Sequence, residues 1–347
     1  MMFNPNFHIS NKILSHIAQI EAAKQVIDTA PLIPSYERKF RDEALIRAIH
    51  YSTHIEGNPL AYGDAKKVLE GKSDEVIARE RDIQDIINYR NVLKYIEEIQ
   101  KQPVTKQTIL AIHKIVVERI LPPEYAGKFR TEKVALRNSK TEEVIFMPPD
   151  AIEVVRLVED LVGWVESGET NEIYPVLKAG IVHYEFERIH PFVDGNGRTG
   201  RALTTLMLYR AGYDIKKFFC LDEYYDRNLQ SYYEALQTVK QPDNDLTSWL
   251  EYFTYGLLDE FLKIKEKVLK ISRDVKIKNT IGQIALSERQ ERVVEFISDY
   301  GKIQNKDWQA LFPEISDDTI LRELKDLEKK KVVKKRGKTK AAYYELR

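Results

Sequence analysis

The sequence predicts a mainly α-helical protein with two short β-hairpins, and three observations support this fold class. Apolar residues recur at helical spacing over most of the chain. Strand-like alternation is confined to residues 134–147 and to two short runs near the C-terminus, 332–335 and 341–346. With 347 residues the chain is long enough for two or three domains with ample core, so helix packing rather than a sheet should stabilise it.

The first region, residues 1–102, is predicted to consist of helices. Its second helix ends in the segment Ser52-Thr53-His54-Ile55-Glu56-Gly57-Asn58, where Gly57 suits a left-handed helix cap and Asn58-Pro59 suits a turn. Its last helix is a long, charged, amphipathic run. The predicted helices cover residues 11–29, 36–56, 62–69 and 73–100.

The second region, residues 103–258, begins with Pro103 and with Thr105 as a helix N-cap. A β-hairpin is predicted at residues 134–147. Side chains alternate from Val134, the polar residues 138–141 form a turn, and extended chain resumes at Val144-Ile145-Phe146-Met147. Taken alone, such a hairpin is an ordinary connection.

Residues 190–201 read HPFVDGNGRTGR and lie between two predicted helices. The helix before them, residues 174–188, has Pro175 in its first turn, and the helix after them, residues 198–211, is followed by Gly212 as a cap. Three glycines in this segment spell GxGxxG, but the dinucleotide-binding pattern must follow a strand. Because a helix precedes it here, the sequence argues against a dinucleotide-binding fold.

The same segment combines residue types that suit phosphate chemistry. Backbone N–H groups of Gly195-Asn196-Gly197 at a helix start would form a cradle for phosphate oxygens. Arg198 and Arg201 lie near one face of the new helix, where they can bind further phosphates. Asp194 is a hard oxygen ligand suited to magnesium, and His190 suits a general base. The sequence therefore predicts a phosphate-transfer enzyme.

The segment HPFVDGNGRTGR resembles the signature of Fic-domain proteins, HxFx(D/E)GN(G/K)RxxR, at every defined position. The commonest activity of that family is transfer of AMP from ATP to a protein hydroxyl with release of pyrophosphate. The resemblance implies ATP as substrate, Mg²⁺ as cofactor, His190 as general base and Asp194 as magnesium ligand. It implies nucleotide and phosphate binding by Gly195, Asn196, Gly197, Arg198, Thr199, Gly200 and Arg201, with the two arginines on the distal phosphates.

A second resemblance concerns the end of the helix near residues 36–57. Ser52, Glu56 and Gly57 match the (S/T)xxxE(G/N) pattern of the Fic subclass that carries its own inhibitory helix. In that subclass the glutamate pairs with the last arginine of the motif, which is Arg201 here. The resemblance therefore implies an autoinhibited AMP transferase that acts on a Ser, Thr or Tyr hydroxyl. Removal of AMP, transfer of another phosphate-containing group, and nucleotide-sensing regulation of transcription remain open.

Two further sites follow from the resemblance. In Fic proteins a hairpin at the place of residues 134–147 binds the target by strand addition, which implies a target-binding flap. A tyrosine pair after the motif encloses the nucleoside, although such aromatic stripes are more often core, and Gln237 and Lys240 stand where an asparagine is common. The residues implied are Val144, Ile145, Phe146 and Met147 in the flap, and Tyr232, Tyr233 and Leu236 around the nucleoside.

The C-terminal part is predicted to be a charged linker, residues 259–280, followed by a separate domain, residues 281–347. Helical patterns at 287–300, 306–312 and 316–331 precede the two strand-like runs, an order that resembles a winged helix-turn-helix. Five acidic residues in the third helix argue against DNA contact, whereas the turn between the strands is basic. Binding of DNA and docking of protein through this domain both remain open.

Bulk properties favour an intracellular enzyme. Lys+Arg and Asp+Glu both number 54, so no global charge directs the chain to nucleic acid or membrane. Cys220 is the single cysteine, and the start MMFNPNFHIS lacks the basic segment of a signal peptide. We expect a cytoplasmic protein without a membrane span. Its expected partner is a protein that carries the modified hydroxyl, with the chain itself as one candidate, and a homodimer is a further expectation.

Overall fold

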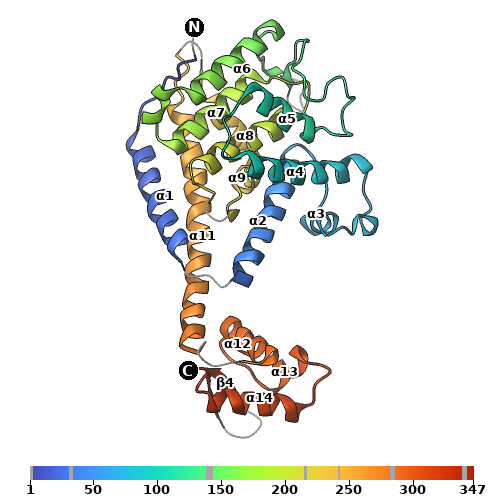
Figure 1. Ribbon diagram of the computed structural model, residues 1–347, viewed down its shortest axis with the longest axis vertical. Helices are drawn as coiled ribbons and strands as arrows, with labels where there is room; N and C mark the ends of the chain where they lie inside the picture. Colours follow the sequence, from blue (N-terminus) through green and yellow to red (C-terminus); the bar gives the residue numbers. More distant parts are fainter. Residues whose placement is uncertain are drawn as a thin grey trace. The chain divides into compact units, whose positions relative to one another are not determined.

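The structure is a computed structural model that describes residues 3–30, 34–137, 144–214, 217–240, 243–281, 286–337 and 342–347. Helices make up most of the described chain (Figure 1). The chain divides into two compact units. The first comprises Met1–Thr29 and Pro34–Glu266, and the second comprises Ala30–Ile33 and Lys267–Arg347.

The first unit begins with four helices, three of which agree closely with the prediction. They are α1 (Asn11–Thr29), α2 (Pro34–Ile55), α3 (Tyr62–Leu69) and α4 (Glu80–Ile99). The single helix predicted for residues 73–100 is wrong, because a short 3₁₀ turn, η1 (Ser73–Glu75), precedes extended chain and α4 begins only at Glu80. Arg79 is extended before the helix, and its guanidinium binds Asp82 at 2.8 and 2.9 Å, in the first turn.

The helices that carry the motif lie in the middle of the first unit. They are α5 (Lys106–Val116), α6 (Ala151–Glu166), α7 (Pro175–Ile189) and α8 (Asn196–Arg210), with a 3₁₀ turn η2 (Gly168–Glu172) before α7. The predicted Thr105 N-cap is confirmed: its hydroxyl accepts the Thr108 backbone N–H at 3.1 Å. Helix α7 packs against α8, and eleven of its residues are buried. The predicted loop between two helices is thus confirmed.

The remaining helices of the first unit are α9 (Leu221–Arg227), α10 (Leu229–Gln237) and the first part of α11 (Thr247–Ile281). Helix α11 passes close to α7 at Gly180. A methyl group on Gly180 would lie 2.9 Å from both Leu250 Cδ2 and Phe253 Cδ1. The two helices therefore need a residue without a side chain at this crossing.

This contact predicts the effect of one substitution on stability. We expect Gly180→Ala to lower the free energy of unfolding by about 1–3 kcal/mol, because a methyl group would overfill a packed core. The matched control is Gly163→Ala in α6, where the new methyl group meets no atom within 4 Å. That change should raise stability by about 0.5–1 kcal/mol through helix propensity. Urea unfolding of both variants measures the difference, and equal effects would contradict the packing argument.

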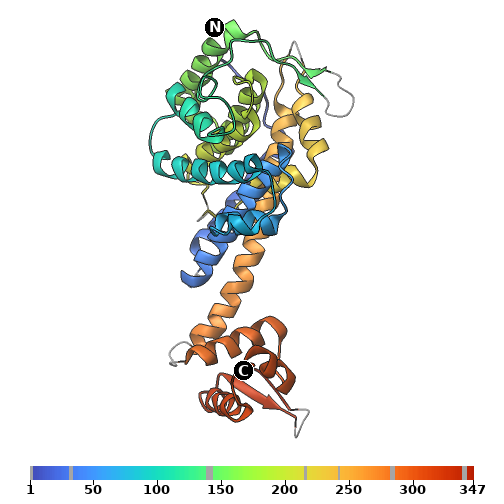
Figure 2. The ribbon, with the colours of Figure 1, turned by 90° about the vertical axis from the view of Figure 1, so that its right-hand side faces the viewer.

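The predicted hairpin of the first unit is present as two short antiparallel strands, β1 (Leu136–Arg137) and β2 (Val144–Phe146) (Figure 2). Leu136 pairs with Phe146 and Arg137 pairs with Val144. The turn predicted at residues 138–141 lies outside the described residues.

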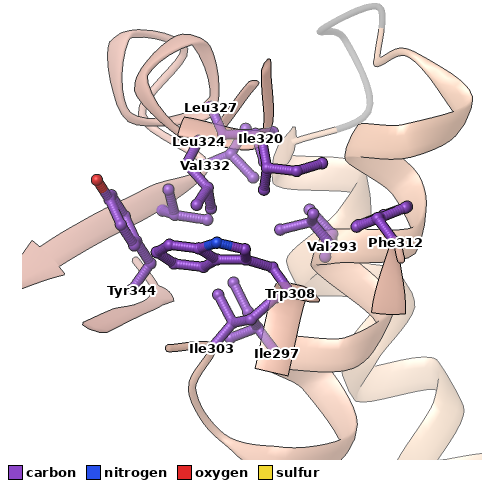
Figure 3. Packing of buried hydrophobic residues seen from close by; sticks show 12 residues of the cluster. Val293, Ile297, Ile303, Trp308, Phe312, Ile320, Leu324, Leu327, Val332 and Tyr344 are labelled. Carbon is purple, nitrogen blue, oxygen red and sulfur yellow. The ribbon is translucent and has the colours of Figure 1, made fainter. Parts of the chain in front are cut away.

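After the end of α11, the described residues of the second unit form three helices followed by a hairpin, in the predicted order. They are α12 (Glu288–Tyr300), α13 (Asn305–Leu311), α14 (Asp317–Lys329), β3 (Val333–Arg336) and β4 (Tyr343–Leu346), with the strands antiparallel. Figure 3 shows their shared core around Trp308, which is 4% exposed. Residues 259–280, the expected linker, lie within α11, and the two units divide inside that helix. Among the described residues, no helix is long and apolar enough to cross a membrane.

Candidate active site

The motif loop is held in an unusual backbone shape by its own residues. Helix α7 ends at Ile189, His190 has a left-handed φ of 48°, and Gly195 has a φ of 78° just before α8. A side chain on Gly195 would lie 2.8 Å from Val117 Cγ1, so only glycine fits there. The Asn196 side chain ties the loop together, since it accepts from and donates to the Phe192 backbone, both at 2.9 Å.

Arg130, which the sequence analysis did not single out, anchors the loop from outside. It is 3% exposed, and its guanidinium donates to carbonyl oxygens on both sides of the site. On the motif side these are His190 O at 2.8 Å and Ile189 O at 3.3 Å. On the hairpin side they are Glu132 O at 3.0 Å and Pro149 O at 2.6 Å. One buried cation therefore fixes His190 relative to the base of the β1–β2 hairpin.

The imidazole of His190 is held neutral. Its side chain is 18% exposed, and burial lowers the pKa of His190 to about 4. Its Nδ1 atom is buried and has no hydrogen-bond partner among the described residues. The nitrogen left for a substrate is therefore Nε2. At neutral pH the ring carries a free lone pair and can accept a proton.

Asp194 lies at the surface of the loop, with its side chain 39% exposed. One oxygen accepts the Gly195 N–H at 2.6 Å and lies 3.4 Å from Arg198 Nη2, and the other lies 3.4 Å from Arg81 Nη2. The described residues contain no cluster of three or more His, Cys, Asp or Glu side chains that could hold a metal by themselves. One exposed carboxylate beside an anion site fits Mg²⁺, which usually takes one or two carboxylates together with substrate phosphates.

Arg201 is buried among anionic and polar groups. Its Nε donates to Ser52 Oγ at 2.9 Å, and its Nη2 donates to the Ser52 carbonyl at 2.7 Å. Nη2 also donates to Glu56 Oε1 at 3.0 Å. Asp222 Oδ1 lies 3.0 Å from Nε as an ion pair. Burial opposes the charge, but the Glu56 and Asp222 carboxylates outweigh it and raise the pKa of Arg201.

The Glu56 carboxylate occupies the start of α8. A methyl group on Gly197, in the first turn of this helix, would overlap Glu56 Oε1 and lie 2.9 Å from Arg201 Nη1. Gly57 follows with a φ of 88°, as predicted for a helix cap. The carboxylate therefore sits where backbone N–H groups and the helix dipole favour an anion. The pairing of Glu56 with Arg201 that the resemblance implies is present.

Arg198 is also held by a carboxylate. It is 4% exposed, and its Nη1 binds Asp85 of α4 in a short ion pair. Asp85 in turn accepts from Asn58 Nδ2 at 3.3 Å, and the same Nδ2 donates to the Asp82 carbonyl at 2.9 Å. Both motif arginines therefore pair with a carboxylate from the N-terminal helices. Arg201 pairs with Glu56 itself, and Arg198 pairs with Asp85, which is hydrogen-bonded to Asn58 in the turn after Glu56.

Two residues predicted to bind phosphate face inward instead. Thr199 is fully buried and its hydroxyl donates to the Gly195 carbonyl at 2.7 Å, which stabilises the first turn of α8. Gly200 faces α7, and a methyl group there would overlap Glu187 Oε1. These positions support the loop rather than present groups to a ligand.

The tyrosine pair divides between core and surface. Tyr232 is 2% exposed, donates or accepts a hydrogen bond with His183 Nε2 at 2.8 Å, and stacks on Tyr225 with ring centroids 4.5 Å apart. Tyr233 is 40% exposed and Leu236 is partly exposed. Only the latter two offer surface to a nucleoside, whereas Tyr232 packs in the aromatic core that the sequence analysis kept as an alternative.

The predicted flap residues lie on β2 and just after it. Val144 is 46% exposed and Met147 is 56% exposed, while Phe146 is partly buried. Residues 138–143 of the same predicted flap, and the side chain of Ile145, lie outside the description. The hairpin therefore presents apolar side chains at its surface beside the segment fixed by Arg130.

The order of helices around the motif loop agrees with one family of proteins. Residues 103–208 match the model of the Fic/DOC family. The chain contains a Fic/DOC domain. It is distantly related to protein adenylyltransferases called Fic. The Drosophila grimshawi protein is 33% identical over 184 residues, which cover 51% of this chain and 35% of that protein. The Drosophila willistoni protein is 30% identical over 205 residues, covering 57% and 38%. The chain thus spans about a third of the length of these curated relatives.

Solved structures share the Fic fold over a larger part of the chain. A Fic family protein from Desulfovibrio desulfuricans G20 superposes with a TM-score of 0.67 at 22% identity, covering 99% of this chain and 98% of that one. A Fic domain-containing signaling protein from Bacteroides thetaiotaomicron gives 0.62 at 22% identity, covering 76% and 97%. Fic-1 from C. elegans gives 0.59 at 23% identity, covering 75% and 74%. The architecture is therefore a mainly α-helical Fic fold with a small C-terminal β-hairpin.

Sequence reasoning missed the side chains that hold the motif residues from other helices. Arg130, Asp85 and Asp222 each contact the motif across long stretches of sequence. None of them belongs to a short pattern, and each looks like an ordinary charged residue in a charged chain. Glu187 precedes His190 by one helical turn and could have been noticed from that spacing.

Proposed function

We propose that the chain transfers AMP from ATP to a Ser, Thr or Tyr hydroxyl of a protein target and releases pyrophosphate. The observation that carries this proposal is the anion seat at the start of α8, where the Glu56 carboxylate lies over Gly197 and contacts Arg201. A position that binds a carboxylate has the positive electrostatic potential and the hydrogen-bond donors that a nucleotide phosphate needs. His190 stands at the other end of the same loop.

The residues suit each part of such a transfer. His190 accepts the proton of the target hydroxyl as its oxygen bonds to the α-phosphorus, and the bond from that phosphorus to pyrophosphate breaks. Arg198 and Arg201 hold the distal phosphates. Asp194 would hold Mg²⁺ with those phosphates, where the ion neutralises phosphate charge. The exposed apolar residues of β2 would position the target by strand addition.

The same geometry supports autoinhibition by Glu56. Its carboxylate pairs with the Arg201 guanidinium. A nucleotide bound in the loop therefore could not place a distal phosphate against Arg201. Transfer should then be slow until Glu56 leaves. Ser52 and Asp222 would keep Arg201 in place after that movement.

A direct test uses a native lysate, because the target is a protein of unknown identity. The Glu56→Gly variant, ATP and Mg²⁺ are added, and tryptic peptides are searched for an adenylyl group. We expect adenylylated Ser, Thr or Tyr residues that are absent when ATP is omitted. Peptides carrying only other phosphate-containing groups would favour a different transferase on the same fold.

A second function, binding of DNA by the second unit, gains support from the direction of the α14 side chains. The face of α14 opposite the core carries the exposed residues Arg322, Lys325 and Lys329. Of the acidic residues that argue against DNA contact, Asp318 and Glu328 are exposed, and the other three pair with polar or charged side chains of the second unit. Asp326 binds Lys330 and Gln290 at 2.7 Å each, Asp317 accepts from Gln309 at 3.1 Å, and Glu323 lies 3.5 Å from Arg289. The outward face is therefore more basic than the helix sequence suggests.

We expect the full chain to bind duplex DNA through this face, as a winged helix-turn-helix would. Fluorescence polarisation at two salt concentrations measures it, because each lost phosphate contact lowers the salt slope by about 1. The triple variant Arg322→Glu, Lys325→Glu, Lys329→Glu should weaken binding. The control is Arg38→Glu, Lys39→Glu, Lys101→Glu, three exposed positions in the first unit. No binding, or equal loss in both variants, would instead favour docking of protein.

A further inference from the structure

Glu187 carries a buried carboxyl group beside His190, and the proposed AMP transfer gives it no role. It lies on α7, three residues before His190, and its side chain is 12% exposed. Its Oε1 atom is buried and has no hydrogen-bond partner among the described residues. A buried carboxyl oxygen without a partner is costly, so its presence calls for an explanation.

The packing of α8 against α7 is shaped around this carboxyl group. A methyl group on Gly200 would overlap Glu187 Oε1 and lie 2.9 Å from Phe186 Cδ1. The last glycine of the motif is therefore needed for the approach of Glu187. This contact gives Gly200 a role that phosphate binding does not explain.

Glu187 faces the nitrogen of His190 that substrate cannot reach. Its Oε2 atom lies 3.9 Å from His190 Nδ1, and Nδ1 is itself buried without a hydrogen-bond partner among the described residues. This distance is too long for a hydrogen bond, which needs about 2.7–3.2 Å. A shift of roughly 1 Å would bring Oε2 into hydrogen-bond range of Nδ1.

We propose that Glu187 is the positioning residue of His190, because Oε2 of its buried carboxyl group is the side-chain oxygen that faces Nδ1, a buried nitrogen without a hydrogen-bond partner among the described residues. An ionised Glu187 accepts a hydrogen bond from Nδ1–H, which keeps the proton on Nδ1 and leaves the lone pair on Nε2 for the target hydroxyl. When Nε2 takes the hydroxyl proton, the ring becomes a cation that the carboxylate stabilises, and no proton moves to Glu187. This inference rests on the proposed AMP transfer.

The surroundings of Glu187 connect this role to Glu56. Burial raises the pKa of Glu187 to about 8, the Arg201 guanidinium opposes that rise, and the Glu56 carboxylate adds to it. Besides burial, the Glu187 carboxyl group also contributes to the raised pKa values of Tyr232 and Tyr233 of α10. At pH 7, with Glu56 in place, Glu187 is mostly protonated, so no carboxylate is present to accept the hydrogen bond from Nδ1–H. Departure of Glu56 removes a like charge and leaves Arg201 less compensated, so the pKa of Glu187 falls and the carboxylate forms.

The pH dependence of transfer tests this coupling. Because ionisation of Glu187 activates the base, residual transfer by the wild-type chain should rise with pH through about 8. The Glu56→Gly variant should reach its plateau at lower pH. The burial-lowered pKa of His190, about 4, keeps that ring neutral over the whole range. In the double variant Glu56→Gly, Glu187→Gln, the transfer rate should no longer rise with pH. Compared with Glu56→Gly, kcat should fall about 10-fold or more and KM for ATP should stay unchanged.

Two controls separate positioning from a structural effect. Glu185→Gln alters the neighbouring glutamate of α7, which binds Arg188 at 2.6 Å, and should keep the pH profile of its parent. The ¹⁵N NMR chemical shifts of the His190 ring report its tautomer, and this measurement does not depend on AMP transfer. The His190 signals are identified by their absence in His190→Ala. In the Glu56→Gly background we expect Nδ1–H, and Glu187→Gln should shift the ring toward a mixture. Unchanged ring shifts or an unchanged pH limb would overturn the proposal. Absence of transfer in every variant, with the ring shifts altered, would overturn only the proposed function.

Discussion

His190→Ala, made in the Glu56→Gly background, should lower AMP transfer by about 100- to 10,000-fold, the usual contribution of a general base. The structure gives the physical reason: burial holds the ring neutral, its Nδ1 faces the protein interior, and Arg130 fixes the His190 carbonyl at 2.8 Å. ATP binding should change little, because the phosphate seat is formed by α8 and its arginines. Transfer of labelled AMP and calorimetric titration with ATP measure the two effects.

The matched control for that experiment is His8→Ala, since the His8 side chain is 70% exposed and lies outside the motif. It should transfer AMP at the rate of its parent. If His190→Ala retained the rate of its parent, another group would have to take the hydroxyl proton. Loss of ATP binding together with transfer would indicate that the loop itself had collapsed.

Glu56→Gly should raise AMP transfer by about 10- to 100-fold over the wild-type chain. A hydrogen bond to a charged group contributes about 1.5–3 kcal/mol, and that interaction must be broken before a phosphate can take the seat at Arg201. Arg201 should keep its position in the variant, because Ser52 and Asp222 still hold it at 2.9 and 3.0 Å. The rate of incorporation from labelled ATP is the measurement.

The control for this substitution is Glu70→Gly, at the exposed C-cap of α3, where glycine is well tolerated. It should leave transfer unchanged. Equal rates for wild type and Glu56→Gly would show that the carboxylate does not limit access to the seat. A lower rate in Glu56→Gly would show instead that Glu56 assists the reaction.

The sequence predicted features that depend on neighbouring residues. The Thr105 cap, the left-handed Gly57 and the loop between two helices rest on local backbone preferences, and all three are present. The pairing of Glu56 with Arg201 spans 145 residues, and only resemblance to a known family made it predictable. Tyr232 shows the reverse case, since a position taken from the resemblance is buried against His183.

The support around the motif could not be predicted because it depends on how distant helices meet. Asp85 reaches Arg198 across 113 residues, and Arg130 reaches His190 across 60. Nothing in the sequence distinguishes these residues from the many other charged ones. The buried contact between Glu187 and the backbone of Gly200 likewise emerges only when α7 packs on α8. Local chemistry therefore predicted candidate reacting groups, whereas packing determines which residues surround and hold them.

The most direct test of the account follows the two ends of ATP separately. The Glu56→Gly variant is incubated in a native lysate with Mg²⁺ and ATP labelled either at the α-phosphate or at the γ-phosphate. AMP transfer predicts that the proteins labelled only when the variant is added retain the α label and not the γ label, and that His190→Ala, made in the same background, abolishes this signal. A γ label that depends on the variant, or no label that depends on it, would contradict transfer of AMP.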